Sequence, residues 1–481
     1  MANIYIETFG CQMNEADSQY IADRAAASGY AMTANAAEAS VVVLNTCTVR
    51  EGAERRAYGR MAHFKALKRA DPGVKLVVCG CLAEQDRDTM QAAAPYLDGV
   101  FGTRELARLG DALAAWRPSF DDDHCLADER LLLEPLGGHA DCVGDPYAHV
   151  RAFVTVQRGC SYYCTFCIVP HVRGRFDNRP MDDILAECRV ALARGARELT
   201  LVGQTVNAYK EPASGADFAD LLEAVHALDN LDRLTFLTSH PKDYTPKLAA
   251  TMGSLPNLNP RFHLPVQSGS DPILRRMNRK YTVAQYCEKI AAFRARCPGW
   301  ALTTDLIVGF PGESEADFQA TLALCERMGF AQAFMFVYSP RRGTPAAHWE
   351  QIPAEIGGER LRRLVATIDR GVRAWHERKR GRIVRALVAG PSRKDRSKLA
   401  AKTIDNVTVV APAGSLRETE LRTRPWLDVR VDDAFTWGCV GTIVGIAERY
   451  DGVAQPVDAR PTIDLIASRF QERETADAAP A

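Results

Sequence analysis

The stretch Arg158–Arg175, "RGCSYYCTFCIVPHVRGR", contains three cysteines, Cys160, Cys164 and Cys167, in the spacing C-x3-C-x2-C. Three thiols this close in a reduced chain indicate a metal site. Structural zinc sites and ordinary cubane iron–sulfur clusters take four protein ligands. The next cysteine, Cys188, lies in the helical pattern "DDILAECRVALARG", and we interpret it as a core residue. The trio therefore predicts a centre with one open, catalytic position, either an iron–sulfur cubane or a three-cysteine zinc site.

Alternating strand and helix patterns surround this loop from residue 149 to 375. Units of about 35 residues favour a partial or full α/β barrel over an open sheet. The cysteine loop follows the first strand, at the end of a barrel where active sites lie. The six predicted strands are Phe153–Gln157, Glu198–Val202, Arg233–Thr238, Arg261–Val266, Leu302–Val308 and Ala333–Tyr338.

Residues 1–116 have the pattern of a doubly wound α/β domain. The predicted strands are Ile4–Phe9, Val41–Asn45 and Lys75–Cys79, with a helix over Glu15–Ser28 that ends at Gly29. One cysteine follows each strand, namely Cys11, Cys47 and Cys81, whereas Cys79 lies within a strand and is interpreted as core. Residues just past parallel strands converge on one edge of a sheet. We therefore expect a second metal centre at this edge.

The remaining segments are a linker at 117–148, a small all-β barrel at 376–447 and a disordered tail at 448–481. The tail contains one short predicted helix through Ile463, Ile466 and Phe470. The predicted strands of the barrel are Val384–Val388, Asn406–Val410, Asp428–Val431 and Val440–Ile446.

Charge and cysteine usage limit the class of protein. Sixty basic residues balance sixty acidic ones, so a nucleic-acid surface has to be local, such as Arg378–Lys402 with its ten basic residues. This run is either a solvated face or a set of phosphate contacts, and we favour the latter. The amino terminus does not resemble a signal peptide, and we expect a cytoplasmic protein with no membrane span and with reduced thiols.

The C-x3-C-x2-C loop at the end of a first barrel strand resembles the radical S-adenosylmethionine superfamily. The resemblance implies that the amino and carboxylate groups of S-adenosylmethionine supply the fourth ligand to the cluster at Cys160, Cys164 and Cys167. It also implies that the reduced cluster cleaves this cofactor to a 5′-deoxyadenosyl radical.

The two trios together, as far as about residue 447, resemble the methylthiotransferase family. Its motifs are matched by "TFGCQMNEADS", "TSHPKD", "FHLPVQSGSDPILRRMNRKYT", "TDLIVGFPGE" and "VYSPRRGTPAA". The resemblance implies an auxiliary [4Fe–4S] cluster on Cys11, Cys47 and Cys81, hence two [4Fe–4S] clusters in total, and a carboxyl-terminal TRAM domain that binds RNA.

The best match within this family is the branch that converts N6-isopentenyladenosine (dimethylallyladenosine) at position 37 of tRNA to its 2-methylthio derivative. One S-adenosylmethionine supplies the radical in that reaction, and a second methylates sulfur held at the auxiliary cluster. The implied partners are the tRNA anticodon stem-loop, an electron donor and a sulfur source. Three alternatives remain: action on N6-threonylcarbamoyladenosine, action on a ribosomal protein aspartate, and a non-catalytic iron–sulfur protein that binds RNA.

Other residues have two interpretations each. Arg173 and Arg175 contact RNA phosphate or acids of the barrel, and His240 serves the site or packing. Gly309 and Gly312 serve a tight turn or a close approach of cofactor. Two departures from the family pattern, Thr205 and Phe176–Asn178, are not expected to touch a cluster cysteine.

Overall fold

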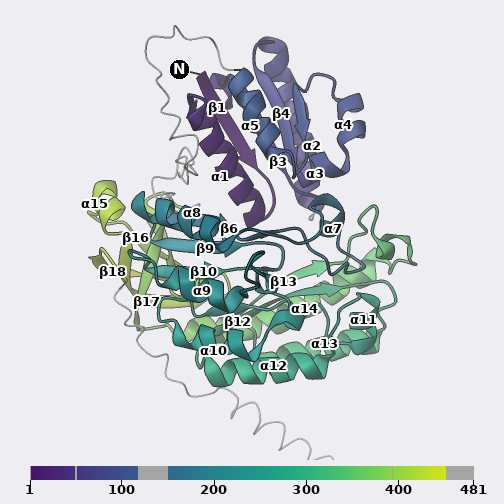
Figure 1. Cartoon of the computed structure of the whole chain (residues 1–481). Coiled ribbons are helices and arrows are strands. Elements are labelled where there is room, and N and C mark those ends of the chain that lie inside the picture. Colours follow the sequence, from purple (N-terminus) through teal and green to yellow (C-terminus); the bar gives the residue numbers. More distant parts are fainter. Residues whose placement is uncertain (1, 49–50, 117–149, 393, 451–481) are drawn as a thin grey trace, which may run out of the picture.

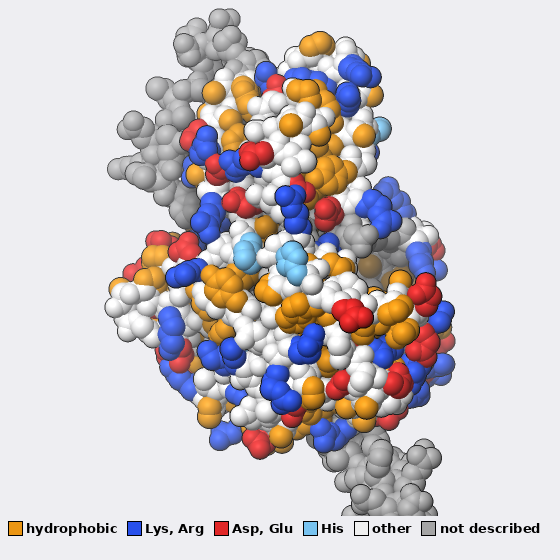
Figure 2. Space-filling model, turned by 90° about the vertical axis from the view of Figure 1, so that its right-hand side faces the viewer, with side chains coloured by type: hydrophobic (Ala, Val, Ile, Leu, Met, Phe, Trp, Pro, Cys, Tyr) orange, Lys and Arg blue, Asp and Glu red, His pale blue; other side chains and the backbone are white. Residues whose placement is uncertain are grey.

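Three folded parts follow one another along the chain (Figure 1). This computed structural model describes residues 2–48, 51–116, 150–392 and 394–450. The predicted linker at 117–148 and, apart from residues 448–450, the predicted tail with its helix lie outside the described residues. Within the described ranges, no helix is both long and apolar enough to cross a membrane. Figure 2 shows acidic and basic side chains interspersed over one face, in keeping with the balanced total charge.

The amino-terminal part is a parallel sheet in the order β2-β1-β3-β4-β5. Every side chain of β3 is buried because helices cover both faces of the sheet. Its central strands match the three predicted ones, whereas β2 and β5 are three-residue edge strands, too short to show a hydrophobic period. The bounds are β1 Ala2–Thr8, β2 Tyr30–Met32, β3 Val41–Thr46, β4 Lys75–Gly80 and β5 Gly99–Phe101.

Helices pack on both faces of this sheet (Figure 1). Helix α1 begins at Gln12, earlier than predicted, because Cys11 is already its N-cap residue. Gly29, at φ 81°, follows the end of α1, as expected. The helices are α1 Gln12–Ala27, α2 Glu51–Ala70, α3 Cys81–Gln85, α4 Arg87–Ala93 and α5 Leu106–Ala115, with a 3-10 turn η1 at Ala36–Glu38.

The central part contains two three-stranded parallel sheets, in the orders β10-β9-β6 and β11-β12-β13. A single bridge between Leu234 and Leu258 joins them into one curved wall. Strand β6 is the outer edge of one sheet and β13 is the outer edge of the other. These two strands do not pair with each other in the described residues, so the barrel is partial. The strands are β6 Arg151–Thr155, β9 Glu198–Val202, β10 Arg233–Phe236, β11 Arg261–His263, β12 Ala301–Val308 and β13 Gln332–Val337.

Helices cover the outer face of this wall and enclose the main core, in which Cys188 on α8 is fully buried as predicted. Capping boxes begin α9, α12 and α13, at Asp217, Thr282 and Ser314. The helices are α7 Val169–Val172, α8 Met181–Ala193, α9 Phe218–His226, α10 Pro246–Ser254, α11 Asp271–Arg276, α12 Val283–Arg296, α13 Glu315–Met328 and α14 Ala354–Glu377. Short elements are β7 Gln157–Arg158, β8 Asp177–Asn178, η3 Val206–Ala208, η4 Pro241–Asp243 and η5 Pro345–His348.

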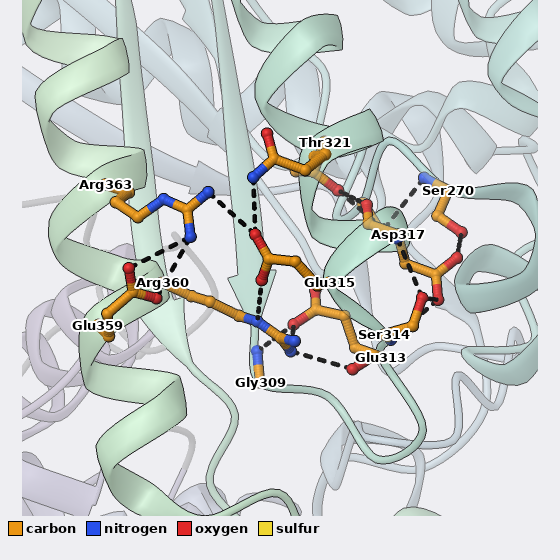
Figure 3. A network of polar contacts seen from close by, with 12 residues as sticks. Ser270, Gly309, Glu313, Ser314, Glu315, Asp317, Thr321, Glu359, Arg360 and Arg363 are labelled. Carbon is orange, nitrogen blue, oxygen red and sulfur yellow. Dashed lines mark hydrogen bonds and ion pairs between the residues drawn. The ribbon is translucent and has the colours of Figure 1, made fainter.

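A buried ion pair anchors α14 on the loop after β12 (Figure 3). Arg360 Nη1 donates to Glu313 Oε2 at 2.7 Å and to the Glu313 carbonyl at 3.0 Å. The Gly309 amide donates to the same carboxylate at 2.7 Å. Burial raises the pKa of Glu313, and the Gly309 amide and Arg360 oppose that shift. Gly309 and Gly312 have φ values of 66° and 81°, which confirms the tight turn.

The carboxyl-terminal part is a closed barrel in the order β14-β15-β16-β18-β17. Strand β15 was not predicted because it lies in the basic run: Leu399, Ala401 and Thr403 are buried, and Lys398, Ala400 and Lys402 occupy the alternate positions. Trp426 is buried and its Nε1 donates to Asp232 of the central part at 2.8 Å. The elements are β14 Ile383–Pro391, β15 Lys398–Thr403, β16 Thr408–Pro412, α15 Glu418–Thr423, β17 Trp426–Phe435 and β18 Gly438–Ala447.

Candidate active site: two cysteine trios joined by an arginine

The first trio lies on the loop between β7 and α7. The Cys160 amide donates to the Gly174 carbonyl at 2.9 Å, and the Cys167 amide donates to the Cys164 carbonyl at 2.9 Å. Gly159 has φ 71°, and a Cβ there would lie 2.0 Å from the Arg175 carbonyl oxygen. Only glycine fits this position, because the two ends of the loop are in contact.

Arg279 places a buried positive charge beside this trio. Its Nη1 lies 3.4 Å from Cys164 Sγ, and its other nitrogens donate to Pro265 O and Tyr281 Oη. Burial disfavours the charge, yet Tyr281 and Cys164 raise the pKa of Arg279 above its ordinary value. Burial also raises the pKa of the Cys167 thiol to about 12. A cation at this place favours the thiolate form, which is the form that binds metal.

Thr205 corrects one expectation. Its Oγ1 lies 3.7 Å from Cys160 Sγ, so this departure from the family pattern does touch a cysteine of the trio. The contact arises because the loop after β9 folds over the end of β7, which spacing along the chain does not reveal. The other departure differs, since Phe176 donates its amide to Ser161 Oγ at 3.1 Å.

The second trio gathers at the carboxyl-terminal edge of the amino-terminal sheet. Cys11 precedes α1, Cys47 follows β3, and Cys81 opens α3 directly after β4. Burial raises the pKa of the Cys81 thiol to about 12, and the charges of Cys47 and Cys11 act in the same direction. The structure therefore brings the three predicted residues together. Cys79 is fully buried in the opposite core, as predicted.

Residue 10 has to be glycine, because the side chain of Cys47 lies directly against it. A Cβ at Gly10 would lie 2.7 Å from Cys47 Sγ, and the residue has φ 117°. A side chain at this position would push Cys47 away from Cys11, the next residue along the chain.

Arg173 links the segment that follows the first trio to the second trio. It follows α7, near the end of the cysteine loop, and is 6% exposed. Its Nε donates to Cys81 Sγ at 3.2 Å and its Nη2 to Asp17 at 2.8 Å. Arg158 also contacts Asp17, at 3.4 Å. Of the two interpretations of Arg173, contact with an acid is therefore correct, although the acid belongs to α1 rather than to the barrel.

His240 packs rather than titrates. Its ring lies 4.4 Å from the Tyr162 ring, and its Nδ1 accepts from the Lys242 amide at 3.1 Å. Burial, followed by repulsion from Arg279, lowers the pKa of His240 to about 2. It is neutral at physiological pH and supports the wall beneath Tyr162.

Each trio offers three thiols as metal ligands. Three thiolates can bind three irons of a cubane, because each cysteine of a cubane binds a different iron. Within the described ranges, no group of three or more His, Cys, Asp or Glu side chains is arranged to hold a single metal ion.

Two buried polar atoms lie at the ends of barrel strands. Gln204 Oε1, after β9, and Ser239 Oγ, after β10, have no hydrogen-bond partner among the described residues. Buried polar atoms in proteins are nearly always bonded, so these two fit a polar cofactor at the same barrel end. Sequence reasoning missed them, together with Arg279, because each is a common residue type placed only by the fold.

Comparison with known proteins agrees with this geometry. The family described as "Uncharacterized protein family UPF0004" matches residues 3–102, and the "Radical SAM superfamily" matches residues 154–325. A solved structure, the radical S-adenosylmethionine methyltransferase TsrM from Kitasatospora setae, has a TM-score of 0.50 at 13% identity, covering 72% of this chain and 77% of that chain. That likeness concerns the fold alone.

Curated relatives are much closer in sequence. The tRNA-2-methylthio-N(6)-dimethylallyladenosine synthase of Anaeromyxobacter dehalogenans is 42% identical, covering 86% of this chain and 90% of its own length. The protein of the same name from Burkholderia thailandensis is 40% identical, with 92% of this chain and 97% of its own length covered. The chain therefore belongs to the tRNA-2-methylthio-N(6)-dimethylallyladenosine synthase family.

Proposed function

We propose that the chain is a radical S-adenosylmethionine enzyme that adds a methylthio group to C2 of N6-dimethylallyladenosine at position 37 of tRNA. The names of the relatives support the substrate. The observation that carries the proposal is a bond between the two parts: Arg173, which follows α7 after the first cysteine loop, donates to Cys81 of the second trio. A reaction that needs both a radical and a sulfur donor requires two such centres side by side.

Cys160, Cys164 and Cys167 would hold one [4Fe–4S] cluster with a position open to S-adenosylmethionine, and Cys11, Cys47 and Cys81 would hold the other. When bound, these groups supply the radical and the sulfur that an unactivated aromatic C–H requires. The protein contributes charge and position. Arg279 and Arg173 each stabilise a neighbouring thiolate.

The cofactor and the remaining partners follow from the same proposal. Gln204 and Ser239 offer buried polar atoms to the amino acid end or the ribose of S-adenosylmethionine. The enzyme would work in the cytoplasm on the tRNA anticodon stem-loop, with an electron donor and a sulfur source supplied by the cell.

Nucleoside analysis of tRNA from a strain that lacks this chain tests the proposal. We expect loss of the 2-methylthio derivative and accumulation of N6-dimethylallyladenosine. Loss of a modified threonylcarbamoyladenosine, or of a modified ribosomal aspartate, would instead assign the chain to a sister activity. Reconstituted, reduced protein that does not cleave S-adenosylmethionine would leave an iron–sulfur protein that binds RNA without catalysis.

A further inference from the structure

A cavity of about 290 Å³ lies where the three parts of the chain meet. Gln12 of α1 lines it from the amino-terminal part, Arg261 and Phe334 from the central barrel, and Lys402 and Trp437 from the carboxyl-terminal barrel. Gln12 directly follows Cys11 in the chain, whereas Arg261, Ala301 and Gln332 place the cavity at the amino-terminal ends of β11, β12 and β13. None of the six cysteines lines it, which distinguishes it from the site described above.

Two cations, Arg261 and Lys402, line this cavity. In the described part of the chain, neither Arg261 nor Lys402 forms an ion pair: Arg261 donates to Gln332 at 2.7 Å and Lys402 to Thr408 at 2.7 Å. Asp405, which also lines the cavity, and Asp305 act on Arg261 from a distance, and Glu198 acts on Lys402. Asp405 is bonded to Lys379 at 2.6 Å and Glu198 to Arg233 at 2.7 Å, so these two carboxylates already have cationic partners.

The electrostatics of Lys402 point in the same direction. Burial, followed by repulsion from Arg151, Arg261 and Arg233, lowers the pKa of Lys402 to about 8. A cluster of cations that repel one another is stabilised by an anion.

Exposed aromatic rings line the same cavity. Phe334 is 39% exposed on edge strand β13, and Trp437 is 52% exposed at the turn between β17 and β18. The Trp437 ring stacks on Phe435, with centroids 5.3 Å apart and planes 8° apart. Exposed, oriented rings are the surfaces on which unpaired RNA bases stack.

We propose that this cavity binds one unpaired nucleotide of the RNA substrate, with its base on Trp437 and Phe334 and its phosphate on Arg261 and Lys402. The inference rests on the proposed function only in taking tRNA as the partner. Because no cysteine lines the cavity, the bound nucleotide is a different one from the target adenosine.

This assignment moves the RNA contact away from the middle of the basic run. Lys379, Arg385 and Lys398 are paired with Asp405, Asp428 and Asp395, so much of the charge of that run is already neutralised. Lys394 and Arg396 remain exposed on the loop before β15. They provide a matched pair of basic residues outside the cavity.

The test measures binding of a fluorescent anticodon stem-loop to full-length, cluster-loaded protein. Trp437→Ala is expected to weaken binding about 10-fold, because it removes the stacking of one base. Trp437→Phe is expected to restore most of it. Lys402→Met is expected to reduce the slope of log affinity against log salt by about 0.7, the value for one phosphate contact on a single strand. The control Lys394→Ala/Arg396→Ala is expected to bind within about 2-fold of wild type.

An RNA series with one abasic site at each loop position identifies the nucleotide. At the position that occupies the cavity, the abasic change weakens binding to the wild type but has no further effect in Trp437→Ala, because both remove the same contact. Circular dichroism and iron content verify that the variants are folded. If Trp437→Ala binds like the wild type while the control pair loses affinity, the RNA lies on the basic loop and the cavity assignment is wrong. If wild-type protein binds no RNA, the proposed function fails as well.

Discussion

The two cysteine trios are brought together in different ways. Cys160, Cys164 and Cys167 lie on one short loop, closed by the contact of Gly159 with Arg175. Cys11, Cys47 and Cys81 come from the ends of three parallel elements, and only the sheet brings them together. The geometry of the first trio depends on backbone hydrogen bonds within one loop. The geometry of the second trio depends on the folding of the whole amino-terminal sheet. The second trio also receives Arg173 from the segment that follows the first.

This difference predicts unequal sensitivity to change. Damage to the amino-terminal sheet separates the thiols of the second trio, while the first trio keeps its geometry.

The largest effect is expected from replacing Cys160, Cys164 and Cys167 with alanine together. Cleavage of S-adenosylmethionine should be abolished and the iron content halved, from about eight irons per chain, because each trio can hold one cubane. Iron analysis and detection of 5′-deoxyadenosine measure this. Cys188→Ala, in the core of α8, is the control and should keep both. Unchanged iron in the triple variant would refute the assignment of ligands.

Replacing Cys11, Cys47 and Cys81 with alanine should separate the two functions. Iron should again fall by half, 5′-deoxyadenosine should still form, and no methylthiolated tRNA should appear, because the sulfur centre is lost. Cys79→Ala serves as control, since that thiol is buried in the opposite core. Circular dichroism checks that the sheet still folds. Continued methylthiolation by the triple variant would remove this trio from the reaction.

Arg173→Met tests the link between the trios. The change leaves Asp17 buried with only Arg158 at 3.4 Å, so we expect a loss of about 3 kcal/mol in the stability of the contact between the two parts. Faster amide hydrogen exchange in α1 would report it. Arg173→Lys should rescue only part, because a lysine cannot bond to Cys81 and Asp17 with a rigid fork.

Arg175→Met is the matched control for this link, because Arg175 is exposed at the other side of Gly174. Hydrogen exchange in α1 should match the wild type in that variant. Equal exchange in Arg173→Met and wild type would mean that the amino-terminal part docks without this bond.

The smallest effect concerns a junction outside both trios. Burial opposes ionisation of Asp405, but Lys379 and its hydrogen bonds lower the pKa to about 2. The unfolded chain takes up the proton at a pH near 4, so this stabilisation is complete above about pH 4 and is lost as the pH falls toward 2. We expect a loss of about 2 kcal/mol for the carboxyl-terminal barrel over this range, measured by tryptophan fluorescence during urea unfolding.

Asp405→Asn should remove that pH dependence while leaving the iron at both trios unchanged. This result would show that the ion pair between Lys379 and Asp405 stabilises the carboxyl-terminal barrel only, whereas Arg173 acts at a thiol of the second trio. A variant with the pH dependence of the wild type would show that other carboxyl groups control the acid unfolding.

Much of the fold could be predicted because the hydrophobic pattern of each strand and helix can be read from a short stretch of sequence. The continuous apolar run at Val41 and the regular strand spacing of the barrel reflect burial that any α/β packing would impose. Strand β15 escaped prediction because Lys398 and Lys402 alternate with small buried residues, so its hydrophobic pattern is weak. Strands β2 and β5 are too short to show a period at all.

The residues of the site also fall into those that local sequence patterns predict and those that they do not. Both sets of thiols could be proposed from the sequence, one from its spacing within a loop and the other from its position after successive parallel strands. The side chains around these thiols could not be proposed in this way, because the packing of the folded parts places them. Arg173 bonds to an acidic residue of α1, and Thr205 contacts Cys160. Arg279 lies against Cys164, and Lys402 lines a cavity to which all three parts contribute. The physical reason is that thiol ligands belong to strand ends and loops, which local pattern specifies. Their charged neighbours come from distant segments, whose positions are set by how whole domains pack.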